Sequence, residues 1–333
     1  MAYTIGTITK GGGKFAHENF ITHIQNQLES FGYVTERAVL SGANHELIMR
    51  ASGYSGEEEF YIGFKTFTDS NTIGSQYFNI GVMVSTGFVS GNAFENQTNG
   101  QVKYVRANGN AFDYAISISL QRVAGSFFTK GKYSQPFYLG KFFSYSATYE
   151  QPLFVGGNIP SPTHGENIST SVSTAENSPF DVYQSKGNTD VAAIFDGSAS
   201  WIQYRQLDFP MSSQGSTSAY ASVAGIFSRQ VPFNDFLYME PMCVAQSKGN
   251  NLDPISFYGE LEGLYAVPSW NNEAFNAIQV GGSYVANVDG LSVAAAIAAI
   301  LNVPGARAFV TIQQFPNGAS INYAQPLMVL ELD

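Results

Sequence analysis

Apolar and polar residues alternate along much of this chain, which is the pattern of β-strands that bury one face. The longest such segment is 112–121, in which large apolar residues at even positions are separated by smaller or polar residues. This alternation predicts a strand with one face in a core and a polar second face. Further strand signals recur at 3–9, 47–49, 59–68, 77–84, 192–197, 201–205, 261–267, 309–313 and 327–330.

Two segments have helical spacing instead. The first begins near Ala16 and stops at Gly32, and its apolar residues share one helical face, namely Phe20, Ile24, Leu28 and Phe31. The second, 291–301, is rich in alanine and is followed by Asn302 and Pro304, which stop a helix. We therefore predict an N-terminal helix and a short C-terminal Ala-rich helix.

A polar stretch divides the chain. Residues 161–190 are rich in Ser, Thr, Asn, Gly and Pro and show little periodicity, as is typical of a long connection. We predict an N-terminal α+β domain over 1–158, a polar loop or linker over 159–190, and a C-terminal β domain over 191–333. The expected fold class is mainly β with minor α, with antiparallel sheets arranged like a sandwich or a barrel.

The composition agrees with this fold class. The 333 residues include 26 Phe, 19 Tyr and 33 Gly, while only 13% are charged. Abundant aromatic residues and glycines favour half-buried sheets and turns over amphipathic helices.

The chain is acidic, with a formal net charge of −10 at pH 7. Affinity for nucleic acid comes largely from Lys and Arg that neutralise phosphates, so we predict no sequence-specific nucleic-acid binding. Five basic residues come closest to forming a cluster, namely Lys103, Arg106, Lys130, Lys132 and Lys141. We interpret them as scattered charges in contact with solvent.

Few residues suit a metal or a cofactor. The single cysteine, Cys243, can form neither an intrachain disulfide nor a multi-cysteine metal site. The four histidines lack the spacing of a helical zinc site, and each is expected on the surface: His17, His23, His45 and His164. Glu57, Glu58 and Glu59 are expected at a solvated entry to a strand. We predict no cofactor-binding and no metal-binding residues.

The N-terminal region also imitates a dinucleotide-binding fingerprint. A strand is followed by Gly11, Gly13 and Ala16 in the spacing G-x-G-x-x-A, then by a helix and a strand that ends in Glu36. The first strand is not a continuous apolar run, and no further strand-helix units follow from which to build a parallel sheet. A nucleotide site is therefore disfavoured.

The sequence contains neither an apolar stretch long enough to span a membrane nor the pattern of a signal peptide. The longest apolar stretch is far shorter than the roughly 20 residues that span a bilayer, and the first residues lack the profile of a signal peptide. We expect no membrane insertion.

Catalytic chemistry has weak support. No Gly-x-Ser-x-Gly nucleophile elbow occurs in the chain. Paired carboxylates for glycoside cleavage come from distant strands, and candidates that lie among aromatic residues are Asp196, Asp208, Asp235 and Glu240. The same aromatic residues could stack on sugars without cleaving them. We predict a protein that is not an enzyme and has no catalytic residues, and a glycan-cleaving enzyme is the less favoured alternative.

Two motifs carry a resemblance to a known family. One is Tyr138-Leu139-Gly140 followed by aromatic residues and then Pro152-Leu153-Phe154-Val155-Gly156-Gly157; the other is Tyr258-Gly259-Glu260-Leu261-Glu262-Gly263 followed by an apolar strand and an asparagine-bearing turn. In these motifs, and in 16–68 and the final apolar strand, the chain resembles a family of virion structural proteins of tailed bacteriophages. These motifs are made of glycine turns and apolar strands, and they bring no active-site residues with them.

The resemblance implies a function. We expect a non-enzymatic structural component of a tailed-bacteriophage virion, forming a ring or another symmetric oligomer in the tail region, at the neck or collar, the tail terminator, or the tail tip and baseplate. Its expected partners are other copies of itself and adjacent virion proteins such as the tail tube, sheath, connector or baseplate. The expected location is the virion, assembled in the host cytoplasm. The alternative is a tail protein that binds a host glycan receptor.

Overall fold

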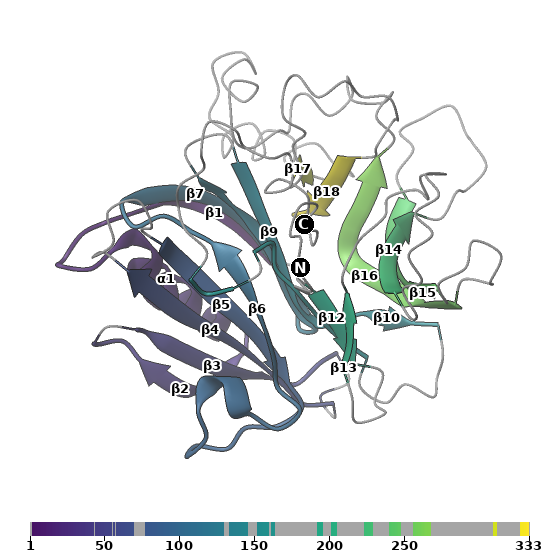
Figure 1. The fold of residues 1–333 in the computed structure, drawn as a ribbon, viewed down its shortest axis with the longest axis horizontal. Helices are drawn as coiled ribbons and strands as arrows, with labels where there is room; N and C mark the ends of the chain where they lie inside the picture. Colours follow the sequence, from purple (N-terminus) through teal and green to yellow (C-terminus); the bar gives the residue numbers. More distant parts are fainter. Residues whose placement is uncertain are drawn as a thin grey trace, which may run out of the picture.

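The computed structural model describes residues 2–42, 44–54, 56, 58–69, 77–129, 133–145, 152–159, 161–163, 192–195, 201–204, 223–228, 240–247, 256–267, 309–311 and 327–332. These residues form three antiparallel sheets and one α-helix, α1 (Ala16–Ser30) (Figure 1). The prediction of a mainly β fold with sandwich-like antiparallel sheets and an N-terminal helix is confirmed. The predicted helix at 291–301 lies outside the described residues.

The first sheet has seven strands in the order β1-β7-β8-β9-β11-β12-β13. Its strands are β1 (Ala2–Thr9), β7 (Ala111–Ile118), β8 (Arg122–Thr129), β9 (Tyr133–Lys141), β11 (Leu153–Gly156), β12 (Ala192–Phe195) and β13 (Trp201–Tyr204). Because β12 pairs with β11 and β13 pairs with β12, the first sheet takes strands from both sides of the predicted 159–190 connection.

The second sheet has five strands in sequence order. They are β2 (Val34–Val39), β3 (Glu46–Ala51), β4 (Phe60–Asp69), β5 (Tyr77–Ser85) and β6 (Gln101–Arg106), and a short 3-10 helix, η1 (Phe94–Asn96), lies in the loop before β6. Alternation in β4 buries Phe60, Ile62 and Phe64 completely, whereas Tyr61 and Lys65 on the other face are only partly buried. The expected division of this strand into two faces is confirmed.

The third sheet has the order β14-β15-β16-β18-β17, and the short strand β10 (Phe143–Ser144) also pairs with β16. Its other strands are β14 (Val223–Ser228), β15 (Glu240–Ser247), β16 (Ser256–Val267), β17 (Phe309–Thr311) and β18 (Leu327–Glu331). The motif Tyr258 to Gly263 therefore lies within β16.

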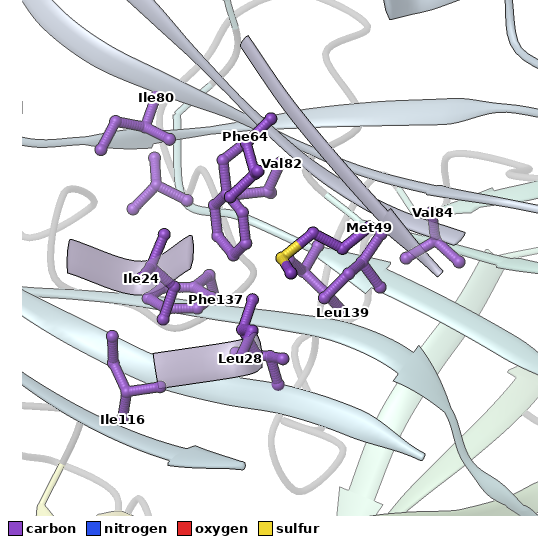
Figure 2. Packing of buried hydrophobic residues seen from close by; sticks show 14 of the residues in the cluster. Ile24, Leu28, Met49, Phe64, Ile80, Val82, Val84, Ile116, Phe137 and Leu139 are labelled. Atoms are coloured by element: carbon purple, nitrogen blue, oxygen red, sulfur yellow. The ribbon is translucent and has the colours of Figure 1, made fainter. Parts of the chain in front are cut away.

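One hydrophobic core joins the first sheet, the second sheet and the helix. Figure 2 shows Ile24 and Leu28 of α1 in one cluster with Phe64 of β4 and Phe137 of β9. Phe20 lies edge-on to Phe127, with ring centroids 4.8 Å apart, and both rings are fully buried. The predicted apolar face of the helix is the face that packs into this core. The helix ends at Ser30, and Gly32, which has a φ of 97°, follows its C-cap residue Phe31.

The predicted polar face of 112–121 is not solvated. Phe112, Tyr114 and Ile116 enter the core as expected, but Ala115 and Ser117 on the opposite face are also fully buried. The middle of β7 is thus buried on both faces, with small side chains on the second face. The alternation predicted that this strand has two different faces, but it did not predict that the second face is buried.

Candidate functional site

The most elaborate cluster of polar side chains lies where β16 meets the hairpin between β7 and β8. We call this cluster the buried junction and define it by Tyr33, Tyr54, Ser119, Arg122, Tyr138 and Glu262. Arg122 is the first residue of β8 and has no solvent-exposed surface. Its Nη1 donates to the carbonyl of Ser117 at 2.7 Å, and its Nε lies 3.8 Å from Oε2 of Glu262.

Both carboxylate oxygens of Glu262 have partners. Oε2 accepts a hydrogen bond from Ser119 Oγ at 2.8 Å, and Oε1 accepts one from the Tyr54 hydroxyl. The backbone N–H of Glu262 donates to the Tyr138 hydroxyl at 3.3 Å. A buried carboxylate is stable only with such compensation, so these contacts hold β16 against β7, β8 and β9.

Two tyrosines complete the junction. The Tyr33 hydroxyl donates to the carbonyl of Ser119 at 2.7 Å, and the Tyr138 hydroxyl donates to the carbonyl of Lys141 at 2.6 Å. Burial raises the pKa of both Tyr33 and Tyr138 well above the ordinary value of a tyrosine. Both hydroxyls therefore stay protonated at neutral pH and act as hydrogen-bond donors.

Gly263 allows the guanidinium of Arg122 to approach β16. It has a φ of 72°, and a Cβ atom at this position would collide with Nη2 of Arg122. Only glycine meets both demands, since L-residues rarely adopt this φ and the space is taken. The second glycine of the motif at 258–263 is thus explained by packing on a buried charge.

The motif that ends at Gly157 forms a second contact between sheets. Gly157 lies against the backbone of Tyr104 in β6, where a Cβ atom would collide with the Tyr104 carbonyl oxygen. The same carbonyl accepts hydrogen bonds from the N–H of Asn158 at 2.9 Å and of Ile159 at 3.2 Å. The Asn158 side chain accepts from the N–H of Arg106 and donates to Gln135. We call residues 157–159 the β6 clasp, because they attach the first sheet to the edge strand of the second.

The basic residues differ from the sequence prediction. Of the five residues interpreted as solvated charge, Lys103, Arg106 and Lys141 are almost completely buried, and Lys130 and Lys132 lie outside the described residues. Lys141 pairs with the half-exposed Glu58, and its ammonium lies 5.7 Å from the centre of the Phe60 ring. The prediction of solvation was wrong because local sequence does not show which loops fold over a strand. Glu58 and Glu59 are exposed as predicted, while Glu57 lies outside the described residues.

The prediction of surface histidines was also wrong for two residues. His17 and His45 are buried, His23 is partly buried, and His164 lies outside the described residues. His17 Nε2 lies 2.7 Å from Thr68 Oγ1. Burial and the nearby His45 lower the pKa of His17 to about 3, and burial also lowers the pKa of His45. Both rings are therefore neutral at pH 7, which is the form that an apolar interior tolerates.

The imitation of a dinucleotide site fails on geometry. β1 runs antiparallel to β7, and every strand pair among the described residues is antiparallel, whereas the dinucleotide fold needs parallel strands. At the start of α1 the N–H of Phe15 donates to the Glu18 carboxylate at 2.6 Å. The helix N-terminus is thus partly satisfied by the chain's own carboxylate.

Three aromatic side chains gather on the surface beside the buried junction. Tyr54, Phe143 and Tyr145 are each about half exposed. The Tyr145 hydroxyl donates to Glu260, the Tyr54 hydroxyl donates to Glu262 two residues further on, and Phe143 is the strand partner of Glu260. We call these residues the aromatic patch. Sequence reasoning missed it, because Tyr54 is distant in the chain from Phe143 and Tyr145.

The predicted candidates for glycan cleavage are not brought into this site. Asp196, Asp208 and Asp235 lie outside the described residues, and of Glu240 only the backbone, at the start of β15, is described. Within the described ranges there is no group of three or more His, Cys, Asp or Glu side chains placed to hold a metal ion. In the same ranges, no helix has the length and apolar character to cross a membrane.

Comparison with protein-family models and with curated proteins finds no match for this chain.

Proposed function

We propose that this chain is a structural subunit of a tailed-bacteriophage virion, working in the tail region as one copy of a ring or another symmetric oligomer. The observation that carries the proposal is the position of the two motifs that resemble the phage family. One supplies Glu262 and Gly263 to the buried junction, and the other supplies Gly157 to the β6 clasp. Both motifs thus fasten one sheet to another.

This use of polar groups suits a subunit that transmits load and keeps its shape. The carboxylate and the hydroxyls of the junction have partners in one another or in nearby backbone carbonyls. Buried polar networks with such partners make a fold rigid and specify one arrangement. A rigid subunit can present the same surfaces to each neighbour in a symmetric assembly, with copies and adjacent virion proteins as its partners.

Electron microscopy of the purified protein, combined with antibody labelling of particles, tests this proposal. The expected result is a ring or another closed oligomer, and label on the axis of the tail. Monomers at all concentrations together with unlabelled particles would overturn it. Turnover of a substrate by the monomer would overturn the non-enzymatic part.

A second candidate function, binding of a host glycan, is favoured by the aromatic patch. Half-exposed aromatic rings stack on the apolar faces of sugars, and a carboxylate such as that of Glu260 accepts hydrogen bonds from sugar hydroxyls. A glycan array probed with the wild type and with Tyr145→Ala separates the two functions. Retention of a specific glycan by the wild type, with loss in the variant, supports receptor binding, and absence of any retained glycan removes this candidate.

A further inference from the structure

The first strand of the chain is an edge without the usual protection. β1 pairs with β7 along its whole length, from Ala2 opposite Ile118 to Thr9 opposite Ala111, with no bulge. Among the described residues no strand pairs with its other side. It carries no charged residue and no proline, and none of its residues is fully buried. Proteins usually protect such edges with charges, prolines or bulges, because a bare edge pairs with another chain.

The two edges of the second sheet are protected in ways that β1 lacks. β2 carries Glu36 and Arg37, and its register shifts between Thr35 and Arg37, as at a bulge. The edge of β6 is closed by the β6 clasp. Within the described ranges, the edges β2 and β6 are thus protected and the edge β1 is not.

The backbone groups that β1 offers can be identified. The N–H of Lys10 donates to the carbonyl of Asn110 at 2.6 Å, which makes Lys10 a residue bonded to the neighbouring chain segment. Hydrogen-bonded positions alternate along an antiparallel strand. The even residues therefore bond to β7, and Tyr3, Ile5 and Thr7 direct their N–H and C=O groups away from the sheet. The carbonyl of the next such residue, Thr9, accepts from Asn19 at 2.9 Å.

We propose that β1 pairs with β1 of a second copy of this chain, antiparallel about a two-fold axis, with Ile5 opposite Ile5. The choice of a second copy rests on the symmetric assembly proposed above, and the strand supports it because the pairing is self-complementary. Tyr3 lies opposite Thr7 of the second copy, Thr4 lies opposite Gly6, and no like charges face each other. About six backbone hydrogen bonds form between the copies. A two-fold contact needs only one kind of surface, so it closes without a second bare edge.

Light scattering coupled to size exclusion tests the contact through Ile5→Lys, which places two ammonium groups opposite each other across the axis. The expected result is that the mass of the wild-type oligomer falls by half. The matched control is Val39→Lys, since Val39 is also a β-branched apolar residue and lies on the protected edge β2; the mass of this variant's oligomer should not change. The unfolding midpoint of each variant shows whether it has kept its fold.

Oxidative cross-linking is a second test of the β1 contact, and it does not require that the assembly be disrupted. Residues in a hydrogen-bonded antiparallel pair have Cα atoms about 5.5 Å apart, within the range of a disulfide. Ile5→Cys should form a reducible covalent dimer, and Val39→Cys should not.

The outcomes separate this inference from the proposed function. An oligomeric wild type whose mass is unchanged by Ile5→Lys, with no cross-link from Ile5→Cys, overturns the β1 contact and leaves the proposed function standing. A wild type that is monomeric at every concentration overturns the β1 contact, and together with unlabelled particles it also overturns the proposed function.

Discussion

The buried junction and the outer face of the second sheet use the same ion-pair chemistry in opposite surroundings. On the outer face, Lys65 lies 3.0 Å from Glu46 and 2.8 Å from Glu95, and Arg37 lies 3.6 Å from Glu46. All four side chains keep between 15% and 38% of their surface exposed. In the junction, Arg122 and Glu262 are exposed by 0% and 6%. We call the exposed group the surface network.

The difference in burial decides how much the surface network and the buried junction each contribute to the stability of the fold. The side chains of the surface network keep partial contact with water, so their ion pairs gain little over separated charges. In the junction, removal of one partner leaves the other in the interior without compensation, which is much more costly than the pair itself is stabilising. The junction therefore specifies how β16 docks, whereas the surface network mainly keeps an exposed face soluble.

The largest expected effect is that of Glu262→Gln. This change leaves the buried Arg122 guanidinium without its counter-charge, and we expect a loss of about 3–5 kcal/mol in the free energy of unfolding, measured by guanidinium denaturation. The matched control is Glu260→Gln, two residues away on β16 and partly exposed, with an expected loss below about 1 kcal/mol. Equally small losses of unfolding free energy in the two variants would refute the claim that the buried junction holds β16 in place.

Gly157→Ala tests the β6 clasp without changing any charge. The added methyl group meets the Tyr104 carbonyl oxygen, which is backbone and cannot rotate away, so we expect a loss of about 1–3 kcal/mol. Gly11→Ala is the control, because nothing lies within 4 Å of a Cβ at Gly11, and it should change stability by less than about 0.5 kcal/mol. A Gly157→Ala variant as stable as the control would show that the sheets do not need this close approach.

The buried His17 makes the free energy of unfolding depend on pH. Because the pKa of His17 falls from 6.5 to about 3 in the folded chain, the unfolded chain binds the extra proton first, and stability falls as the pH drops below 6.5. Linkage gives a loss of about 2 kcal/mol from His17 between pH 7 and pH 5. His17→Gln should flatten this slope in unfolding experiments across that range. His23→Gln, which removes a partly buried histidine from the same helix, should flatten it less.

The smallest expected effect is that of Lys65→Met in the surface network. We expect a change of about 0–1 kcal/mol, which shrinks further in high salt because exposed charges are screened. Unfolding at low and high salt checks both statements. A loss above about 2 kcal/mol that is insensitive to salt would mean that the two regions do not differ as described.

Much of the fold could be predicted from the sequence, because the spacing of apolar residues within a strand or helix indicates which of its residues are buried. Phe60, Ile62 and Phe64 are fully buried while Tyr61 and Lys65 are partly exposed, and the apolar residues of α1 recur every three or four positions. These patterns are local, and a strand or helix that buries one face must display them in its own residues.

The candidate site could not be predicted in the same way. Arg122, Ser119 and Glu262 are up to 143 positions apart, and nothing near Arg122 in the sequence indicates that β16 covers it. The burial of Lys103, Lys141 and His17 was missed for the same reason. The only available signal was the placement of Glu262 between Leu261 and Gly263 within an apolar strand, where a carboxylate is costly without a partner.

A double-mutant cycle on Arg122 and Glu262 tests most directly whether the junction acts as a structural joint. The free energy of unfolding is measured for the wild type, Arg122→Met, Glu262→Leu and the double variant. We predict that each single change costs about 3–5 kcal/mol and that the double variant costs far less than their sum, because it removes both buried charges together. Additive losses would contradict the account, since they would mean that the two side chains stabilise the fold independently.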